Sequence, residues 1–260
     1  MLILCVCSAG ETSKTRSLLC QSMQALLETA RTPLPDHWDQ TLDLPQVCAV
    51  HTLQALVRGS GLGVAVLQFA PAVAILSLTL LSSPCWAMRN AALQLFSSLC
   101  TRMLGQRPSG EEDGRHQHGM SPPAFFHHYP GLQPFLLAEL SGAAQELQDP
   151  SNEAKLHLQP SLFPVLTLLA QLQPGVQDAT ATLSSFLPPL LQLSSSPIYN
   201  VRVMASRALV AMTPPSEYMS ILSKLIVQLP GSQEPCCHNR LHGQLLQIRA
   251  VLERALCSLR

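Results

Sequence analysis

The residues best suited to metal chemistry lie near residue 240. Cys236, Cys237, His238 and His242 offer thiolate and imidazole ligands of the kind that zinc prefers, and the two histidines, four residues apart, share one face of a helix. Two adjacent cysteines cannot both point at one ion from a regular helix, and the sequence has no second pair of adjacent cysteines. Zinc is therefore the weaker alternative, and the sequence predicts no metal site.

The other histidines predict no acid–base site. His116 and His118, and then His127 and His128, have no carboxylate at a spacing that would orient an imidazole, so loop or surface positions are expected for them. The chain also lacks a glycine-rich phosphate loop, a GxSxG nucleophile motif and a dinucleotide or SAM-type glycine fingerprint. We therefore expect no catalytic residue, no cofactor and no enzyme activity.

The strongest pattern is a repeat in which proline, an aromatic residue, arginine and alanine recur in step. Pro84, Trp86, Arg89 and Ala92 map onto Pro197, Tyr199, Arg202 and Ala205, and a weaker copy contains Pro235, Arg240, Gly243 and Leu246. From Arg89 to Arg202 is 113 residues (202 minus 89), and from Arg202 to Arg240 is 38 (240 minus 202), so 113 is close to three periods of 38.

This period predicts pairs of helices. HEAT and armadillo repeats of roughly 40 to 47 residues are only slightly longer, and a proline suits the first turn of a helix. The residues that follow Pro84 at steps of three or four predict one buried face: Cys85, Met88, Ala92, Leu95, Phe96, Leu99 and Met103. We expect an all-α fold without β-sheet, in which residues 1–260 form a single right-handed, HEAT/armadillo-like α-solenoid segment.

The repeated arginine has a structural interpretation. At the edge of the apolar face, Arg89 can bury its alkyl stem while its guanidinium reaches carbonyls or a carboxylate of the neighbouring repeat. Arg89 and Arg202 are thus expected to be equivalent, each bridging to an adjacent repeat. Contact with a ligand is the alternative.

Composition indicates a folded chain without a global charge. Of 260 residues, 47% are hydrophobic and 12% charged, and sixteen basic residues balance sixteen acidic ones, so any RNA contact must be local. Nine cysteines scattered through apolar stretches indicate a reducing compartment, for which the cytoplasm is the expectation.

Two apolar stretches raise the question of a membrane. Residues 1–10 have an apolar start but no charged n-region, which favours a chain that begins inside a longer helical array over a signal peptide. Leu62 to Leu81 approaches the length of a membrane span. Because Pro71 lies at its centre, two shorter helices are expected there, with a membrane span as the alternative.

The remaining sequence predicts further helices and two polar insertions. A loop at 105–123 and a linker at 149–158 interrupt the helical pattern, and Phe125, Phe126, Tyr129 and Phe135 mark aromatic packing between them. Helices are expected at 17–29, 45–57, 160–173, 179–193, 197–212, 215–229 and 236–259, with another ending at Glu146.

Several of these segments together resemble the THADA (thyroid adenoma-associated) protein family over roughly residues 18 to 260. They are Ser82–Ser97, Thr101–Gly105, Phe125 and Phe126, Pro134–Leu137, Ser196 and Pro197, Arg207–Val210, His242 and Gly243, and Leu245–Gln247. The resemblance implies a very long all-helical protein. It also implies a non-catalytic partner subunit of the SAM-dependent methyltransferase that modifies ribose 2′-OH groups in the tRNA anticodon loop, with that enzyme and tRNA as partners.

The sequence departs from the family at two places. Of the family's Arg-rich Ser-Ala-Gly-Leu-Pro motif, only Ser8, Ala9 and Gly10 are present, and the loop at 105–121 contains three consecutive acids, residues 111–113, where the family is more basic. The candidate contacts with a partner or RNA are Arg89, Arg102, Arg107, Arg115, Arg202 and Arg207. The alternative function is a protein–protein or membrane-associated scaffold without an RNA role.

Overall fold

Helices form all the regular structure that the chain shows. The computed structural model describes residues 13–39, 43–105, 119–148, 159–174, 183–231 and 237–258, and these ranges contain no strand. The all-α prediction is confirmed. The chain divides into two compact units, residues 1–111 and 112–260, so the boundary falls inside the predicted 105–123 loop. That residues 1–260 form one continuous right-handed solenoid stays a prediction.

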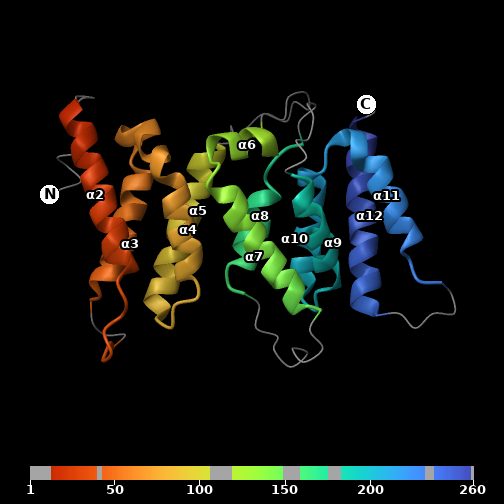
Figure 1. Cartoon of the computed structure of the whole chain (residues 1–260), viewed down its shortest axis with the longest axis horizontal. Coiled ribbons are helices and arrows are strands. Elements are labelled where there is room, and N and C mark those ends of the chain that lie inside the picture. Colours follow the sequence, from red (N-terminus) through yellow and green to blue (C-terminus); the bar gives the residue numbers. More distant parts are fainter. Residues whose placement is uncertain are drawn as a thin grey trace. The chain divides into compact units, whose positions relative to one another are not determined.

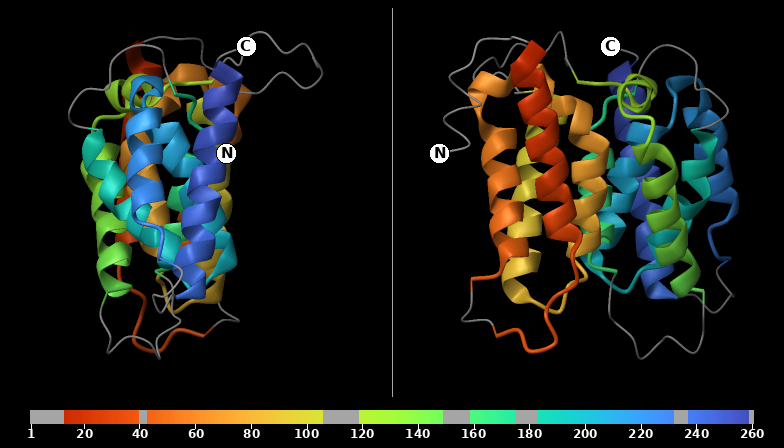
Figure 2. Two further views of the ribbon diagram at one scale, coloured as in Figure 1. Left: turned by 90° about the vertical axis from the view of Figure 1, so that its right-hand side faces the viewer. Right: turned by 60° about the vertical axis from the view of Figure 1, so that its left-hand side comes forward.

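Within its described residues, the first unit contains four α-helices packed side by side (Figures 1 and 2). They are α2 (Ser13–Arg31), α3 (Pro45–Arg58), α4 (Ala70–Leu80) and α5 (Trp86–Leu104), with the 3-10 helix η1 (Ser60–Phe69) between α3 and α4. Helix α5 packs against α3 and α4, and α2 packs against the same two helices. Helix α3 begins at Pro45, as predicted.

The buried face predicted for α5 is confirmed. The seven side chains predicted for it, from Cys85 to Met103, are each at most 4% exposed. Complete burial of one large apolar side chain stabilises a fold by about 1.5–3 kcal/mol, so this face is a main source of the stability of the first unit.

The apolar stretch from Leu62 to Leu81 forms two shorter elements, as expected. Gly63 has φ 43° and ψ −126° and kinks η1, and Pro71 lies in the first turn of α4, where its missing N–H costs no hydrogen bond. Among the described residues, no helix has the length and apolar character needed to cross a membrane.

The second unit is built around α10. Its α-helices are α6 (Pro122–His128), α7 (Leu132–Glu146), α8 (Leu162–Leu169), α9 (Leu187–Gln192), α10 (Tyr199–Met212), α11 (Tyr218–Val227) and α12 (His238–Ser258). Its 3-10 turns are η3 (Ser184–Phe186), η4 (Leu193–Ser195) and η5 (Pro215–Glu217). Helix α10 packs against α8, α9 and α12, and α12 also packs against α11 and η4.

Several predicted boundaries need correction. Pro84 and Pro197 do not begin helices but precede them, since α5 starts at Trp86 and α10 at Tyr199. Within the described part of the predicted 179–193 helix, η3, α9 and η4 follow one another, because Pro188 opens a new helix in the first turn of α9. The predicted 105–123 loop is too long at its end, where Pro122 begins α6. The 149–158 linker lies outside the described residues.

The predicted aromatic packing is present at α6. Phe125 contacts both Phe126 and Tyr129 with ring centroids 5.2 Å apart, and Phe126 stacks on Phe186 of η3 at 5.4 Å. The half-buried Phe135 takes no part in the aromatic contacts of the described residues. Phe126 thus links the start of the second unit to the turn before α9.

Candidate functional site

The repeated motif builds a closed turn before α5. The hydroxyl oxygen of Ser83 accepts a hydrogen bond from the backbone N–H of Cys85 at 3.3 Å. Arg89, in the first turn of the helix, donates from Nη1 to the carbonyl oxygens of Ser83 and Pro84, both at 2.8 Å. The guanidinium thereby satisfies two carbonyls that the tight turn leaves without helical partners.

The same turn precedes α10. The hydroxyl oxygen of Ser196 accepts from the N–H of Ile198 at 3.3 Å, and Nη1 of Arg202 donates to the carbonyls of Ser196 at 2.7 Å and Pro197 at 3.0 Å. The arginine in each copy lies six residues after the serine. The predicted equivalence of Arg89 and Arg202 is therefore confirmed at the level of the turn.

The two arginines differ in what else they contact. Arg202 also donates from Nε to Nδ1 of His242 at 3.2 Å and from Nη1 to Oδ1 of Asn239 at 3.0 Å, which connects α10 to α12. The exposed ring of Tyr199 lies 5.8 Å from that of His242 and 6.0 Å from the Arg202 guanidinium carbon. The predicted bridge to a neighbouring repeat is confirmed for Arg202.

The predicted bridge is wrong for Arg89. Both acceptors of Arg89 belong to the turn before its own helix. The physical reason is the packing order: α5 contacts α3 and α4, which precede it, whereas the first turn of α10 faces the later helix α12.

Arg102, another candidate contact residue, also has a structural role. It donates from Nε to the carbonyl of Val57 at 2.9 Å and from Nη2 to the carbonyl of Gly59. These carbonyls end α3, where the helix leaves acceptors without partners and where a cation is favourable. Arg102 thus links α5 to the C-terminal end of α3.

Arg207 is the exposed member of the predicted set within the described residues. It lies on α10 and lines a cavity of about 290 Å³ together with Glu253, Arg254 and Cys257 of α12. Arg254 donates from Nη2 to Oε1 of Gln173 at 3.0 Å.

The remaining predicted contact residues lie outside the described part of the chain. These are Arg107, Arg115, Ser8, Ala9 and Gly10. Contact of the predicted residues with a partner or RNA stays a prediction.

The third copy of the repeat is present in its small residue but not in its arginine. Arg240 is exposed on α12 and closes no turn among the described residues, whereas Gly243 is buried. A Cβ added to Gly243 would lie 1.9 Å from the carbonyl oxygen of Ser194, so the backbones of α12 and η4 are in direct contact. Ala92 and Ala205, fully buried, occupy the corresponding positions of α5 and α10.

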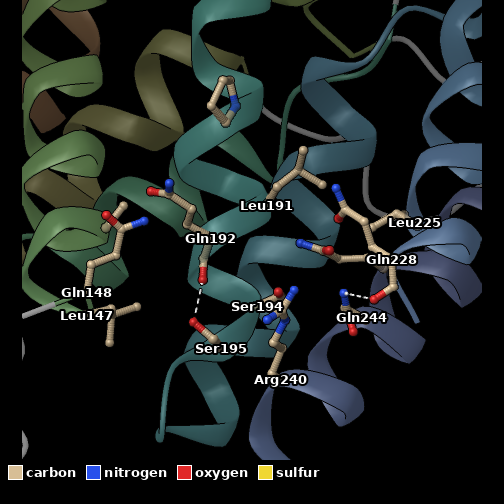
Figure 3. Close-up of a pocket in the computed structure, with 13 residues that line it drawn as sticks. Leu147, Gln148, Leu191, Gln192, Ser194, Ser195, Leu225, Gln228, Arg240 and Gln244 are labelled. Carbon is tan, nitrogen blue, oxygen red and sulfur yellow. Dashed lines mark hydrogen bonds between the residues drawn. The ribbon is translucent and has the colours of Figure 1, made fainter. Parts of the chain in front are cut away.

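A larger cavity, of about 480 Å³, lies in the second unit between α7, α9, η4, α11 and α12 (Figure 3). Among the described residues, its polar lining contains no carboxylate and comprises Gln148, Gln192, Ser194, Ser195, Gln228, Arg240, Gln244 and Gln247. Its apolar lining comprises Ala144, Leu147, Pro188, Leu191 and Leu225. We refer to it as the glutamine cavity. The sequence interpretation missed it, although two glutamines three residues apart within an otherwise apolar helical turn were a signal.

Two of these glutamines are buried and only partly hydrogen-bonded. Gln244 donates from Nε2 to the carbonyl of Gln228 at 3.4 Å, and Gln247 donates from Nε2 to the carbonyl of Leu190 at 3.0 Å. Both side chains are at most 5% exposed, and the Oε1 atom of each has no hydrogen-bond partner. Figure 3 shows the amide of Gln244 in the cavity wall beside Arg240.

The candidate ligands of a metal or an acid–base site are not brought together. The described residues contain no group of three metal-ligating side chains; Cys237 is exposed and His242 accepts from Arg202. His127 and His128 are exposed on α6 with ring centroids 6.0 Å apart. Cys236, His116 and His118 lie outside the described residues.

One thiol has a strongly shifted pKa. Burial in α5 raises the pKa of Cys100 to about 12, so this thiol stays neutral and unreactive at neutral pH.

Comparison with known proteins covers nearly the whole chain. The profile of the family described as “THADA/TRM732, DUF2428” matches residues 1–87, and that described as “Trm732, C-terminal TPR repeats” matches residues 89–251. The junction of the two profiles falls within the continuous helix α5. No solved structure gives a significant match.

Relatives from animals and yeast carry one functional name. The chain is 36% identical over 222 residues to the “tRNA (32-2′-O)-methyltransferase regulator THADA” of Gallus gallus, with 83% of this chain and 11% of the relative covered. It is 34% identical over 250 residues to the regulator THADA of Mus musculus, with 94% of this chain and 12% of the relative covered. It is 32% identical over 248 residues to the regulator trm732 of Schizosaccharomyces pombe, covering 92% and 16%. The chain thus spans a small part of the length of these relatives.

Proposed function

We propose a function from the premise that this chain belongs to the THADA/TRM732 family, as the profile matches to residues 1–87 and 89–251 show. The chain acts as a non-catalytic scaffold segment that supports ribose 2′-O-methylation of the tRNA anticodon loop by a partner SAM-dependent methyltransferase. The observation that carries this proposal is the name shared by its relatives, which are regulators of a tRNA (32-2′-O)-methyltransferase.

The proposed mechanism is positioning. Packed helices hold surface residues of distant sequence in fixed relation, and an enzyme and an RNA held in the right geometry react as if at a much higher concentration. The partner enzyme supplies the SAM-dependent chemistry, and this chain contributes binding surfaces. Its two compact helical units support this division of labour.

Because the net charge of the chain is zero, contact with RNA must depend on individual exposed cationic side chains. Phosphate affinity comes from lysine and arginine side chains that can reach the backbone. Arg89, Arg102 and Arg202 donate to main-chain carbonyls. Arg207 and Arg240 are exposed on helices of the second unit and are therefore the better candidates.

We place the protein in the cytoplasm. The described residues contain six free cysteines and no disulfide, and two of these thiols, Cys85 and Cys100, are buried among apolar side chains. Thiols of this kind suit a reducing compartment.

Co-purification tests the proposal against its alternative, a protein–protein or membrane-associated scaffold with no RNA role. This chain and a full-length relative are each captured, and bound RNA and protein are identified. We expect tRNA and a methyltransferase in the captured fraction. Detergent-dependent solubility without RNA would instead support the alternative.

A methylation assay tests what this chain contributes alone. The comparison includes this chain, a full-length relative, and that relative with residues 1–17 of this chain in place of its own corresponding segment, each with the methyltransferase and tRNA. We expect little or no methylation with the short chain, because a scaffold that lacks one docking surface loses the gain in effective concentration. Full activity of the short chain would contradict the positioning mechanism.

A further inference from the structure

We propose that the glutamine cavity binds a single nucleotide, whose base meets the buried carboxamides and whose phosphate meets Arg240. This inference rests on the proposed function, because it assigns a site for the RNA that the scaffold would hold. The cavity volume of about 480 Å³ lies within the range of about 300–1,000 Å³ in which proteins bind small molecules.

The buried amide oxygens indicate what the ligand must offer. A buried acceptor without a donor costs about 1–3 kcal/mol, so the Oε1 atoms of Gln244 and Gln247 favour a ligand that brings N–H or O–H groups. The two residues are three apart on α12 and therefore about 4.5 Å apart along its axis. A ligand with more than one donor is needed to satisfy both.

A base fits this lining better than a simple anion does. Each carboxamide presents a donor beside an acceptor, which is the arrangement that pairs with base edges. Five glutamines contribute such groups: one from α9, two from α12, and one each from the residues that directly follow α7 and α11. Leu147, Leu191 and Leu225 add apolar surface for the face of a base.

The charge of the lining favours a phosphate beside the base. Among the described residues, Arg240 is the single charged residue that lines the cavity, and it makes no hydrogen bond or ion pair there. It is exposed at the start of α12. A guanidinium binds phosphate through paired N–H donors. None of the described lining residues is a carboxylate, so none of them repels the phosphate. Single-stranded RNA offers such an unstacked nucleotide.

The experiment measures binding to the intact 260-residue chain and two single variants. The probes are a fluorescein-labelled nine-nucleotide single-stranded RNA of mixed sequence, the four nucleoside 5′-monophosphates and an acetylated acidic nonapeptide. Arg240→Ala removes the proposed phosphate contact. Arg249→Ala is the matched control, because Arg249 lies on the same helix, is exposed, pairs with Glu253 and does not line the cavity.

We expect Arg240→Ala to weaken RNA binding about 10- to 100-fold, as for loss of a hydrogen bond to a charged group. The slope of log affinity against log salt should fall by about 0.7, the value for one phosphate of a single strand. Arg249→Ala should leave affinity within about twofold of the unsubstituted chain, because an exposed ion pair contributes little.

Gln244→Met separates a ligand contact from a structural role. Methionine keeps the length and approximate volume of glutamine but removes an amide whose oxygen has no partner and whose nitrogen makes a hydrogen bond of 3.4 Å. We expect weaker nucleotide binding at an unchanged or higher melting temperature. A lower melting temperature with unchanged binding would overturn the assignment.

The three probes distinguish the source of the ligand. If the monophosphates bind and the Arg240 and Gln244 variants bind them more weakly, the site accepts a free nucleotide. If only binding of the RNA is detected and is weakened by these variants, the nucleotide must belong to a strand. Both results support the proposal. Absence of RNA binding, equal losses in Arg240→Ala and Arg249→Ala, or binding of the acidic peptide alone would overturn it.

The outcome is separable from that of the proposed function. If this chain or the full-length relative co-purifies with tRNA and a methyltransferase while this cavity binds no nucleotide, only the site assignment fails. If the cavity binds nucleotide but no methyltransferase co-purifies, the site remains and the proposed function fails.

Discussion

The turn before α5 and the turn before α10 are the same structure in two surroundings. In both, a serine hydroxyl caps a backbone N–H, and an arginine six residues later donates to two carbonyls of the turn. Arg89 makes no further contact of this kind in the described residues and is half-buried. Arg202 is 8% exposed and also binds Asn239 and His242.

This difference shows which hydrogen bonds of the repeated arginine depend on the local sequence and which depend on tertiary packing. The turn depends on residues within one short stretch, so it forms in both copies that contain the serine, the proline and the arginine. The additional hydrogen bonds of Arg202 depend on α12. This helix can lie close to η4 because Gly243 has no side chain. The contribution of a repeated residue to stability therefore depends on the helix that packs against it.

The largest effect is expected from Gly243→Ala, which would push α12 away from η4. The added Cβ meets backbone atoms of Ser194, one at 1.9 Å, and cannot be accommodated by rotation of a side chain. We expect a loss of about 3 kcal/mol in the free energy of unfolding, at the upper end for overpacking. Urea unfolding measures this loss, and amide exchange should show it in the second unit.

Gly142→Ala is the matched control for Gly243→Ala. Gly142 also lies within a helix, α7, but its added Cβ would come no closer than 3.9 Å to another group. We expect a stabilisation of about 0.5–1 kcal/mol from the better helix propensity of alanine. Equal effects of the two substitutions would refute the close backbone contact.

Arg202→Ala should destabilise the protein more than Arg89→Ala. Loss of Arg202 leaves buried carbonyls and the α12 side chains without their charged partner, which lowers the free energy of unfolding by about 1.5–3 kcal/mol. Water can reach the carbonyls that Arg89 leaves, so Arg89→Ala should lower it by about 1 kcal/mol. Chemical denaturation of both variants gives the comparison. Arg202→Lys should recover only part of the loss, because lysine lacks the guanidinium fork. Equal losses of stability in Arg202→Ala and Arg89→Ala would mean that the contacts of Arg202 with α12 contribute nothing to stability.

Alkaline pH should destabilise the first unit through Cys100. Burial raises its pKa from 9.0 to about 12 in the folded chain, so between these values the unfolded chain loses the proton that the folded chain keeps. Stability is unaffected by this group well below pH 9 and falls as pH rises through 9, by about 1.4 kcal/mol at pH 10. Unfolding at pH 8 and pH 10 measures the difference.

Cys100→Ala and thiol labelling check the same assignment. The variant should lose this part of the pH dependence. In the folded chain at neutral pH, the exposed Cys48, Cys237 and Cys257 should react with iodoacetamide well before Cys100 does. Rapid labelling of Cys100 would show that the core of α5 opens readily.

The smallest effect concerns the coupling between Arg202 and His242. In a double-mutant cycle, Arg202→Ala and His242→Ala should show a coupling of about 0.5–1.5 kcal/mol, the value of one hydrogen bond. The cycle of Arg89→Ala with His242→Ala should show none, since no contact joins them. A coupling near zero in both cycles would remove the distinction between the two turns.

Local sequence patterns determined the helices and much of the first unit's core. The apolar residues of α5 recur at helical spacing, and all seven predicted members of its buried face are buried because one helix face must turn away from water. The spacing of serine, proline and arginine likewise fixed the two turns, whose hydrogen bonds span at most six residues. The family resemblance also came from sequence alone, and the profile matches confirm it.

Only the tertiary structure decided how these elements meet. Nothing within the stretch around Arg202 specifies that Asn239 and His242 lie opposite it, and nothing around Gly243 specifies the approach of Ser194. The glutamine cavity, too, combines residues from Ala144 to Gln247 that no single helical pattern connects. Contacts of this kind depend on the packing of several helices at once, because side chains distant in sequence fill the space between them. That is why the sequence predicted the repeat, its turns and a bridge from Arg202, while the partners of Arg202 on α12 and the cavity emerged only from the assembled second unit.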